Sequence, residues 1–465
     1  MKNTVAVLGA GIVGVSCALE LQRRGFDVTI FDRTGPGRET SYGNAGVIAR
    51  SSLMPFNHPA LWSTLPKLLK NRSASFRYDP LFLTKNLTWA LKFLSNTRTS
   101  VFNETTAALD ALIRLSTREH QRLMTEAGAA HRLRTTGWLF LYRSEAGFLG
   151  SRLSRDTFEK FDIATQVLDA RELAELEPHL KPLFPRALWI RDTWSVDSPG
   201  QVVEAYARLF TARGGRIRQA SIGALRRSNT SEAWQVTEDA GTVHEASRVV
   251  LALGPWTREF AKKSLGLSVP MAFERGYHMH YRAASGASLA RPVYDTGGGY
   301  VLSPMEQGLR LSTGVQLADR AAPPNLAQLD LAEQAAREAF PLEGRLGDEA
   351  WLGSRPTLPD SRPIIGKCPG RPGLWLAFGH QHIGFNTGPG DGRAPWIDDG
   401  RRDLRVRSCA VPAFPVSRLK DVSAFASTRH GSASVWNLEP AHGAGRGHSR
   451  VFDQKWTFCL PGVTV

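Results

Sequence analysis

The stretch VAVLGAGIVGVSCALELQRRGFDVTIFDR, residues 5–33, decides the fold class of this chain. Val5 to Leu8 reads as a short apolar strand, and Gly9, Gly11 and Gly14 follow it in G-x-G-x-x-G spacing. In a dinucleotide-binding turn the first glycine allows the tight bend, and the second lets the backbone approach a diphosphate. The third lets the following helix pack close to the strand, so this spacing predicts a phosphate-binding turn.

A helix and a second strand complete this unit. We expect a helix from Ile12 to about Arg24, ended by Gly25, with its first amides directed at the phosphates. Val28 to Phe31 predicts the second strand, and Asp32 ends it where a carboxylate accepts from ribose hydroxyls. The series in this order indicates an α/β, Rossmann-like lobe, without separating NAD from FAD.

Composition narrows the class of protein. The chain has 465 residues, 42% apolar and 22% charged, which suggests roughly two or three lobes. No run of about 18 apolar residues predicts a transmembrane helix. The four cysteines are scattered without metal-ligand spacing, so we expect a cytoplasmic protein without disulfides or metal. The net charge is +15, but no dense basic run indicates nucleic-acid binding, and an arginine-rich composition explains the charge better.

The loop RETSYGNAGVIAR, residues 38–50, follows the first unit. Arg38, Thr40, Ser41 and Asn44 offer polar groups, while its small residues keep side chains out of the way. Such a loop can line a flat ring system and a diphosphate, although an ordinary polar turn has the same composition.

These motifs carry a resemblance to a known family. The opening unit, ETSYGNAG (39–46), WLGSRPTLPDSRPIIG (351–366) and LWLAFGHQHIGFNTGPG (374–390) resemble the FAD-dependent amine and amino-acid oxidoreductases. That group includes glycine oxidase, sarcosine oxidase, D-amino acid oxidase and, nearest here, the bacterial D-amino acid dehydrogenases. The resemblance covers residues 1 to about 393, and it implies FAD held without a covalent link.

The predicted cofactor-binding residues come from the glycine turn, the second strand, the polar loop and two later stretches that the resemblance supplies. They are Gly9, Ala10, Gly11, Ile12, Val13, Gly14, Asp32, Arg33, Thr40, Ser41, Asn44, Ala45, Gly46, Ala252, Leu253, Gly254, Trp256, Gly379, His382, Ile383, Gly384 and Phe385. The glycine-dense stretch 379–390 also predicts a helix start that can stabilise charge on a reduced flavin.

The domain organisation follows from alternating patterns along the chain. We expect a discontinuous FAD-binding domain from residues 1–55, 190–270 and 350–393. Within it, RIRQASIGAL (216–225) predicts one strand, parallel in the nucleotide-binding sheet. A substrate domain of antiparallel sheet plus helices is expected from residues 56–189 and 271–349, inserted between those pieces.

The chemistry implied by the resemblance needs few protein groups, because the flavin takes the hydride itself. A planar guanidinium best binds a substrate carboxylate, and Arg275, Arg310 and Arg355 are candidates near the family motifs. Glycine oxidase has an arginine in a GH-x-R stretch, whereas this chain has His382 at that place. We therefore predict four substrate-orienting residues: Arg355, Tyr277, Tyr300 and His382. Each also has a structural interpretation, as a loop anchor or a packed sheet residue.

The predicted function is oxidation of a small D-amino acid, of the D-proline or D-hydroxyproline type, to an imine and then a 2-oxo acid. Electrons would pass to a quinone or another carrier. An oxidase of the glycine or sarcosine type, which uses oxygen, is the alternative. A flavin-binding protein without activity is the alternative from another class.

Two further segments bear on partners. LWSTLPKLLKN and LTKNLTWALKFLSN place leucines at helical spacing among lysines, which fits either packing on the enzyme or a peripheral contact with the inner membrane face. After GPGDGR, residues 394–465 show no sustained helical or strand period. We interpret this tail as the product of a reading-frame shift, with a disordered interaction tail as the alternative.

Overall fold

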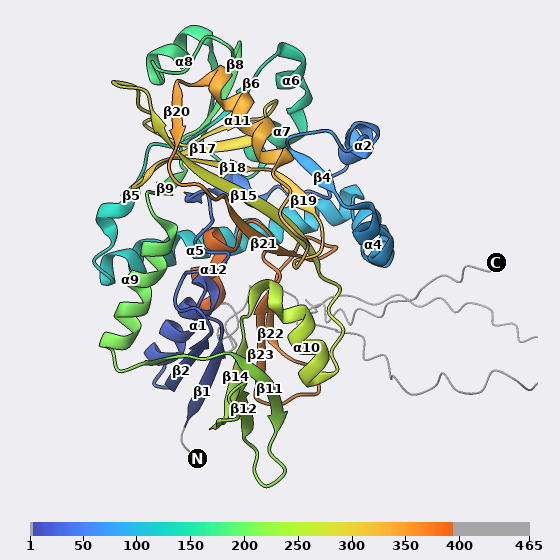
Figure 1. Ribbon diagram of the computed structural model, residues 1–465, viewed down its shortest axis with the longest axis vertical. Coiled ribbons are helices and arrows are strands. Elements are labelled where there is room, and N and C mark those ends of the chain that lie inside the picture. The colour runs from blue at the N-terminus through green and yellow to red at the C-terminus, as the bar shows by residue number, and fades with distance from the viewer. Residues whose placement is uncertain (1–2, 394–465) are drawn as a thin grey trace, which may run out of the picture. The chain divides into compact units, whose positions relative to one another are not determined.

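The computed structural model describes residues 3–393, and these residues build two large sheets, one below the other in Figure 1. The atypical tail of residues 394–465, with its frameshift and disorder interpretations, lies outside the described residues. The predicted division into two discontinuous domains stays a prediction.

The lower sheet is a nucleotide-binding sheet of six strands. Its order is β10 (Arg216–Gln219), β2 (Asp27–Asp32), β1 (Thr4–Leu8), β14 (Arg248–Leu251), β23 (Leu374–Phe378) and β22 (Ile364–Lys367). All neighbouring pairs are parallel except β22, which runs antiparallel to β23. The predicted Rossmann-like α/β fold is thereby confirmed.

Both faces of this sheet are covered, because the apolar residues of β1 alternate between two cores. Val5 and Val7 face the core formed with α1 (Ile12–Arg23), α5 (Thr99–Glu126), α9 (Pro199–Ala212) and α12 (Gly384–Arg393). Ala6 and Leu8 face the opposite core, which includes β11 (Ile222–Arg227), β12 (Trp234–Glu238), β13 (Val243–Ala246) and α10 (Thr257–Leu265). The two-residue period of a strand therefore builds three layers.

The upper sheet is mixed and has eleven strands. Its path is β4 (Phe76–Tyr78), β19 (Val315–Leu317), β15 (Ala272–Ala283), β18 (Gly308–Thr313), β17 (Tyr300–Met305), β16 (Val293–Asp295), β6 (Trp138–Tyr142), β8 (Arg186–Ile190) and β7 (Thr165–Asp169). β20 (Leu342–Arg345) and β21 (Trp351–Thr357) also pair with β15. Most pairs are antiparallel, as expected, but β16 with β6 and β19 with β4 are parallel.

The remaining elements surround the upper sheet. They are α2 (Leu61–Leu69), α3 (Pro80–Lys85), α4 (Leu87–Ser95), α6 (Glu145–Gly150), α7 (Arg152–Lys160), α8 (Ala170–Leu176) and α11 (Ala327–Ala339), with 3-10 turns Arg50–Leu53, Ala130–Arg132 and Gly254–Trp256. A small sheet of β3 (Val47–Ile48), β9 (Trp194–Val196) and β5 (Leu133–Arg134) lies beside them. Across residues 3–393, none of the helices is long and apolar enough to cross a bilayer.

One predicted strand is wrong. RIRQASIGAL was expected to form a single strand, but it divides into β10 of the lower sheet and β11 of a separate three-stranded sheet. The Ala220 amide still donates to the Asp32 carbonyl at 2.8 Å, whereas the next carbonyl, of Ser221, accepts from Asp239. The chain thus changes partner between two adjacent residues, with neither glycine nor proline at the break.

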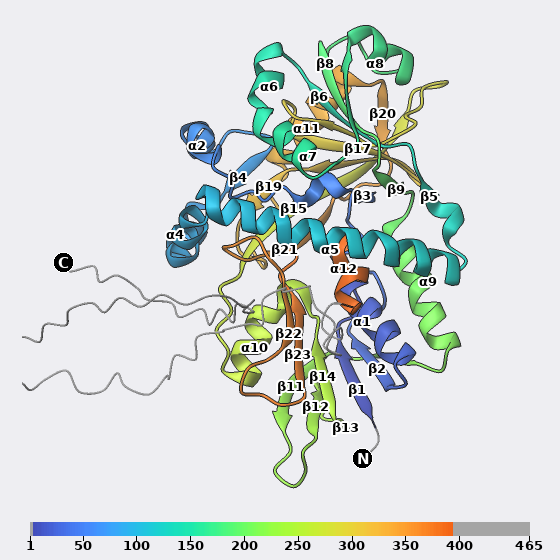
Figure 2. The ribbon, with the colours of Figure 1, turned by 180° about the vertical axis from the view of Figure 1, so that it is seen from behind.

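The helix α12 is wedged between α1 and α5, and its glycines permit that approach. A Cβ on Gly390 would lie 3.0 Å from the Leu112 carbonyl oxygen of α5, and one on Gly392 would lie 2.7 Å from the Ser16 carbonyl oxygen of α1. Figures 1 and 2 both show α12 between these helices. The predicted helix start within the glycine-dense stretch is confirmed at Gly384.

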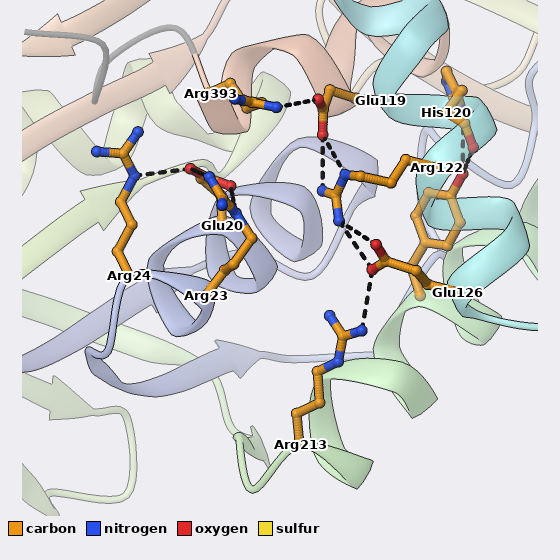
Figure 3. A network of polar contacts seen from close by, with 10 residues as sticks. Glu20, Arg23, Arg24, Glu119, His120, Arg122, Glu126, Arg213 and Arg393 are labelled. Carbon is orange, nitrogen blue, oxygen red and sulfur yellow. Dashed lines mark hydrogen bonds and ion pairs between the residues drawn. The ribbon is translucent and has the colours of Figure 1, made fainter.

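A polar network also ties α12 to α5 and α9 (Figure 3). Arg393 at the end of α12 pairs with Glu119 at 2.6 Å, and Glu119 also pairs with Arg122 at 2.7 Å. Arg122 reaches Glu126 at 2.8 Å, and Glu126 pairs with Arg213 after α9 at 3.1 Å. These pairs join α12, α5 and α9 on the face of the lower sheet that α1 covers.

Candidate functional site

A cavity of about 670 Å³ lies where the carboxyl ends of β1, β2 and β14 face the strands of the upper sheet. Gly9, Asp32 and Ala252 line it from the first sheet, and Tyr300 and Arg355 line it from the second. Ligands of open α/β sheets bind at the carboxyl ends of parallel strands. One part of the cavity therefore lies where a nucleotide binds, at the lower sheet, and the other part is a chamber lined by the upper sheet.

The glycine turn has the shape that a diphosphate requires. Gly9 has φ +108°, and a Cβ there would lie 2.4 Å from the Ala252 carbonyl oxygen. A Cβ on Gly14 would lie 1.9 Å from the Gly9 carbonyl oxygen, so that glycine allows α1 to pack on the turn. Gly11 lines the cavity directly, at the start of α1. A side chain at any of these positions would fill or distort the cradle.

Asp32 and Ser41 fasten this cradle. One carboxylate oxygen of Asp32 accepts from the Ala10 amide at 2.7 Å, and the other accepts from the Thr34 and Gly35 amides, both at 2.9 Å. The Ser41 hydroxyl accepts from the Ile12 amide at 3.0 Å, which brings the polar loop to the start of α1. The Thr34 hydroxyl also donates to Oδ1, at 3.2 Å, whereas Oδ2 accepts from Ala10 alone among residues 3–393. A carboxylate oxygen has two acceptor positions, so Oδ2 retains one for a ribose hydroxyl.

Most predicted cofactor residues are brought together on the cavity wall. The lining includes Gly9, Gly11, Ile12, Val13, Asp32, Arg33, Thr40, Ser41, Asn44, Ala45, Ala252, Leu253, Gly254, Trp256, His382, Ile383, Gly384 and Phe385. Ala10, Gly14, Gly46 and Gly379 do not line it, although they stand next to residues that do. These residues fit a dinucleotide of the size of FAD, and their individual roles stay predictions.

Sequence reasoning missed Arg320, which lines the cavity at its nucleotide end beside Trp256. Two guanidinium groups lie over the Trp256 ring, that of Arg33 at 4.1 Å from the ring centre and that of Arg320 at 5.2 Å. Arg320 also lines the cavity, yet it lies after β19, far from the first unit in sequence. Nothing in the local sequence around Arg320 indicates this contact.

Arg355 is the one candidate carboxylate-binding arginine of the three that lines the cavity. Its guanidinium donates to the carbonyl oxygens of Gly314 at 3.1 Å and Thr313 at 3.4 Å. Within residues 3–393, no carboxylate oxygen lies within 4 Å of it. Burial lowers the pKa of Arg355, and the charge of Glu274 on the paired strand opposes that effect. A partly buried cation with no carboxylate within 4 Å is suited to receive an anionic ligand.

The other two arginines are directed elsewhere. Arg275 is fully buried and donates to the carbonyls of Asp319 and Pro323, at 3.2 and 3.1 Å, away from the cavity lining. Arg310 binds the backbone of the polar loop from behind. Strand register decides this difference, which sequence reasoning left open.

His382 presents an unpartnered nitrogen beside Arg355. Its ring stacks on Phe56, with ring centres 4.6 Å apart, and its buried Nδ1 has no hydrogen-bond partner among the residues that the structure describes. Burial and, to a smaller extent, the nearby Arg355 charge lower the pKa of His382 to about 3, so the imidazole is neutral at neutral pH. Phe56 is a second residue that sequence reasoning missed.

The two predicted tyrosines line the cavity but use their hydroxyls inside the protein. The Tyr277 hydroxyl donates to Gln316 at 3.0 Å and accepts from the Asn325 amide at 2.8 Å and from Arg275 at 3.3 Å. Burial raises the pKa of Tyr300 well above its usual value, and the Asp295 carboxylate adds to the effect. These contacts favour a role for both tyrosines as cavity walls over a role in binding the substrate carboxylate.

Comparison with known proteins places this geometry in context. Residues 4–394 match the model of a family described as "FAD dependent oxidoreductase". A D-amino-acid oxidase of Bradyrhizobium diazoefficiens is 30% identical over 82% of this chain and 91% of that relative. A D-amino acid dehydrogenase 2 of Pseudomonas aeruginosa is also 30% identical, over 86% of this chain and 96% of its own length. The structure of glycine oxidase from Geobacillus kaustophilus matches the fold with a TM-score of 0.65 at 20% identity, over 84% and 93% of the two chains.

Proposed function

This chain belongs to the family of FAD-dependent oxidoreductases, and from that premise we propose that it oxidises a small D-amino acid of the D-proline or D-hydroxyproline type. The product is an imine, which water hydrolyses to a 2-oxo acid. Two relatives, a D-amino-acid oxidase and a D-amino acid dehydrogenase, support the D configuration of the proposed substrate. The observation that carries the substrate class is Arg355, a guanidinium on the cavity wall with no carboxylate oxygen within 4 Å in residues 3–393.

Bound FAD supplies the acceptor for the hydride that leaves the carbon bearing nitrogen. The protein residues then have two tasks, which are to orient that carbon and to hold the zwitterion. Arg355 binds the substrate carboxylate through the N–H groups that its two carbonyl contacts leave free. His382, neutral and stacked on Phe56, offers Nδ1 to the substrate amine without adding a second positive charge. Tyr277 and Tyr300 shape the chamber for the side chain.

The proposed electron acceptor is a quinone or another carrier, and oxygen is the second candidate. One relative is named an oxidase and another a dehydrogenase, and both are 30% identical to this chain. Sequence similarity therefore supports both acceptors equally. Peroxide release under air, measured against reduction of a quinone analogue with the same substrate, separates them.

We also propose a peripheral contact with anionic lipid on the cytoplasmic face of the inner membrane. The Trp62 patch, which we define as the exposed side chains of α2 to α4, includes Trp62, Leu69, Leu81, Leu87 and Leu91 at 55 to 60% exposure. The Trp62 indole donates to Thr97 at 2.8 Å, which joins α2 to the end of α4, and Figures 1 and 2 both show these helices at one edge. Residues 56–98 contain Lys67, Lys70, Arg72, Arg77, Lys85, Lys92 and Arg98 against one acid, Asp79.

An anaerobic titration tests the function. The purified flavoprotein is mixed with D- and L-amino acids, glycine, sarcosine and both hydroxyproline epimers, and flavin absorbance is followed. We expect bleaching by D-amino acids and, in Arg355→Met, an apparent affinity about 10 to 100 times weaker, because a charge-assisted pair is lost. A yellow protein that no amino acid bleaches would instead favour the flavin-binding protein without activity.

A further inference from the structure

The polar loop that carries Gly43, Asn44 and Ala45 is held from behind by one buried cation. Arg310 on β18 is 3% exposed, and its Nη1 donates to the carbonyl oxygens of Tyr42 at 2.9 Å and Asn44 at 2.6 Å. Its Nε donates to Nε2 of His280 at 3.1 Å. Three donor contacts therefore lock the guanidinium between the upper sheet and this loop.

No acid in the described part of the chain pairs with this charge. Among residues 3–393, no carboxylate oxygen lies within 4 Å of Arg310. Burial and, to a smaller extent, the Arg310 charge lower the pKa of His280 to about 4, so His280 is a neutral acceptor. A buried charge without a counter-ion is costly, and a neutral donor would hold a loop at lower cost. The positive charge thus needs an explanation beyond loop anchoring.

The peptide planes of the loop supply that explanation. The Tyr42 carbonyl shares its plane with the Gly43 amide, and the Asn44 carbonyl shares its plane with the Ala45 amide, so each N–H points away from Arg310. Neither amide donates a hydrogen bond within the part of the chain that the structure describes. Both Gly43 and Ala45 line the cavity. A cation at the carbonyl end of a peptide also polarises the N–H at the other end.

Packing keeps these amides in place. A Cβ on Gly43 would lie 1.8 Å from the Trp351 ring, so the indole lies directly against the backbone there. The Trp351 ring in turn stacks on His278, with ring centres 4.8 Å apart and an angle of 16°. The loop is thus clamped by Arg310 at its carbonyls and by Trp351 at Gly43.

We propose that Arg310 is a positioning residue that holds and polarises the Gly43 and Ala45 amides as paired hydrogen-bond donors to the flavin. Reduction increases the negative charge on the flavin, and preorganised donors stabilise such charge. Arg310 therefore raises both the affinity for FAD and the flavin midpoint potential. The proposal rests on FAD occupying this cavity, and it is independent of which amino acid is oxidised.

The test uses the purified flavoprotein with Arg310→Met and Arg310→Lys. In Arg310→Met we expect the dissociation constant for FAD, measured by reconstitution of apoprotein, to rise about tenfold. We also expect reduced flavin to lose a further factor of about ten relative to oxidised flavin, which lowers a two-electron midpoint potential by about 30 mV. Arg310→Lys, which keeps the charge without the fork, should recover part of both effects.

Arg291→Met is the matched control. Arg291 is 8% exposed and pairs with Glu177 at 2.7 Å, away from the cavity lining. Its loss should reduce stability while the FAD affinity and the midpoint potential stay at wild-type values. A wild-type potential in Arg310→Met, or an equal shift in Arg291→Met, overturns the proposal. If Arg310→Met retains no flavin, Arg310→Lys decides, and a wild-type potential there overturns it. Substrate bleaching is not used, so failure here is distinct from failure of the proposed reaction.

Discussion

Gly276 leaves the space that the Arg355 guanidinium occupies on the adjacent strand: a Cβ on Gly276 would lie 2.3 Å from Arg355 Nη2. The two residues lie on β15 and β21, whose antiparallel register pairs Gly276 with Gly353 and Glu274 with Arg355. The absence of a side chain at one position therefore fixes where the cation of the other lies in the cavity.

Gly276→Ala should displace that guanidinium and weaken substrate binding. Because misplacement of a binding group by about 1 Å can cost about 100-fold, we expect kcat/KM for the amino acid to fall at least tenfold, mostly through KM. Flavin content should stay at the wild-type level. Gly150→Ala is the control, since a Cβ there meets nothing within 4 Å. Steady-state kinetics that match wild type in Gly276→Ala would remove Arg355 from the carboxylate site.

Glu274 should make substrate binding depend on pH near neutrality. Burial raises the pKa of Glu274 to about 7, while the Arg355 charge opposes that effect. Below pH 7 the carboxyl is neutral and Arg355 keeps its full charge for the substrate. Above pH 7 the carboxylate forms and competes for that charge, so KM should rise as the pH passes through 7.

Glu274→Gln should remove this rise while it keeps the shape of the side chain. The sign for stability follows from the same shift: the folded state binds the Glu274 proton more tightly than the unfolded state does. The wild type should therefore lose stability between about pH 4.5 and pH 7, and the variant should lose less. KM profiles between pH 5.5 and 8.5 in both proteins check the first statement, and parallel profiles would contradict it.

Tyr277→Phe should affect stability more than catalysis. The hydroxyl has three partners inside the protein, and their loss leaves buried polar groups without hydrogen bonds. We expect the free energy of unfolding to fall by about 1–3 kcal/mol, measured in urea. Tyr78→Phe is the control, because that hydroxyl makes a single exposed contact, at 2.9 Å, with the Leu69 carbonyl. A tenfold higher KM with unchanged stability would restore Tyr277 as a substrate-binding residue.

The nucleotide-binding half of the site could be predicted because its signal is local. The spacing of Gly9, Gly11 and Gly14, with an acid at the end of the next strand, sets the turn geometry within one β-α-β unit. The break within RIRQASIGAL could not be predicted, because both halves have equal strand character and only the partner strands differ.

The substrate half depends on contacts between residues that are distant in sequence. Three arginines, Arg275, Arg310 and Arg355, are alike in the sequence, and only strand pairing directs one of them to the cavity. The stack of Phe56 on His382 joins a loop before α2 to the loop before α12, and neither local sequence predicts it. These contacts are tertiary, so residue type and spacing narrow the candidates without choosing among them.

The Trp62 patch should bind anionic vesicles through both its apolar and its basic residues. Leu87 and Leu91 are 57% and 60% exposed on α4. The double substitution Leu87→Ser with Leu91→Ser therefore removes apolar area that would be buried in the membrane interface, with little loss of internal packing. Leu149→Ser is the matched control, since Leu149 is 65% exposed on α6, outside the patch. In co-sedimentation at low salt we expect the double variant to lose most vesicle binding and the control to keep it.

Charge gives an independent arm of the same test. A lysine near an anionic surface contributes about 1 kcal/mol, so Lys67→Gln and Lys92→Gln should each weaken binding about fivefold. Added salt should reduce wild-type binding, because it screens the attraction between the lysines and the anionic lipid. At 0.1 M salt the screening length is already only about 10 Å. Neutral phosphatidylcholine vesicles should bind weakly under all conditions. Binding that is equal on neutral and anionic vesicles, or that survives the Leu87 and Leu91 substitutions, would assign these helices to ordinary surface packing.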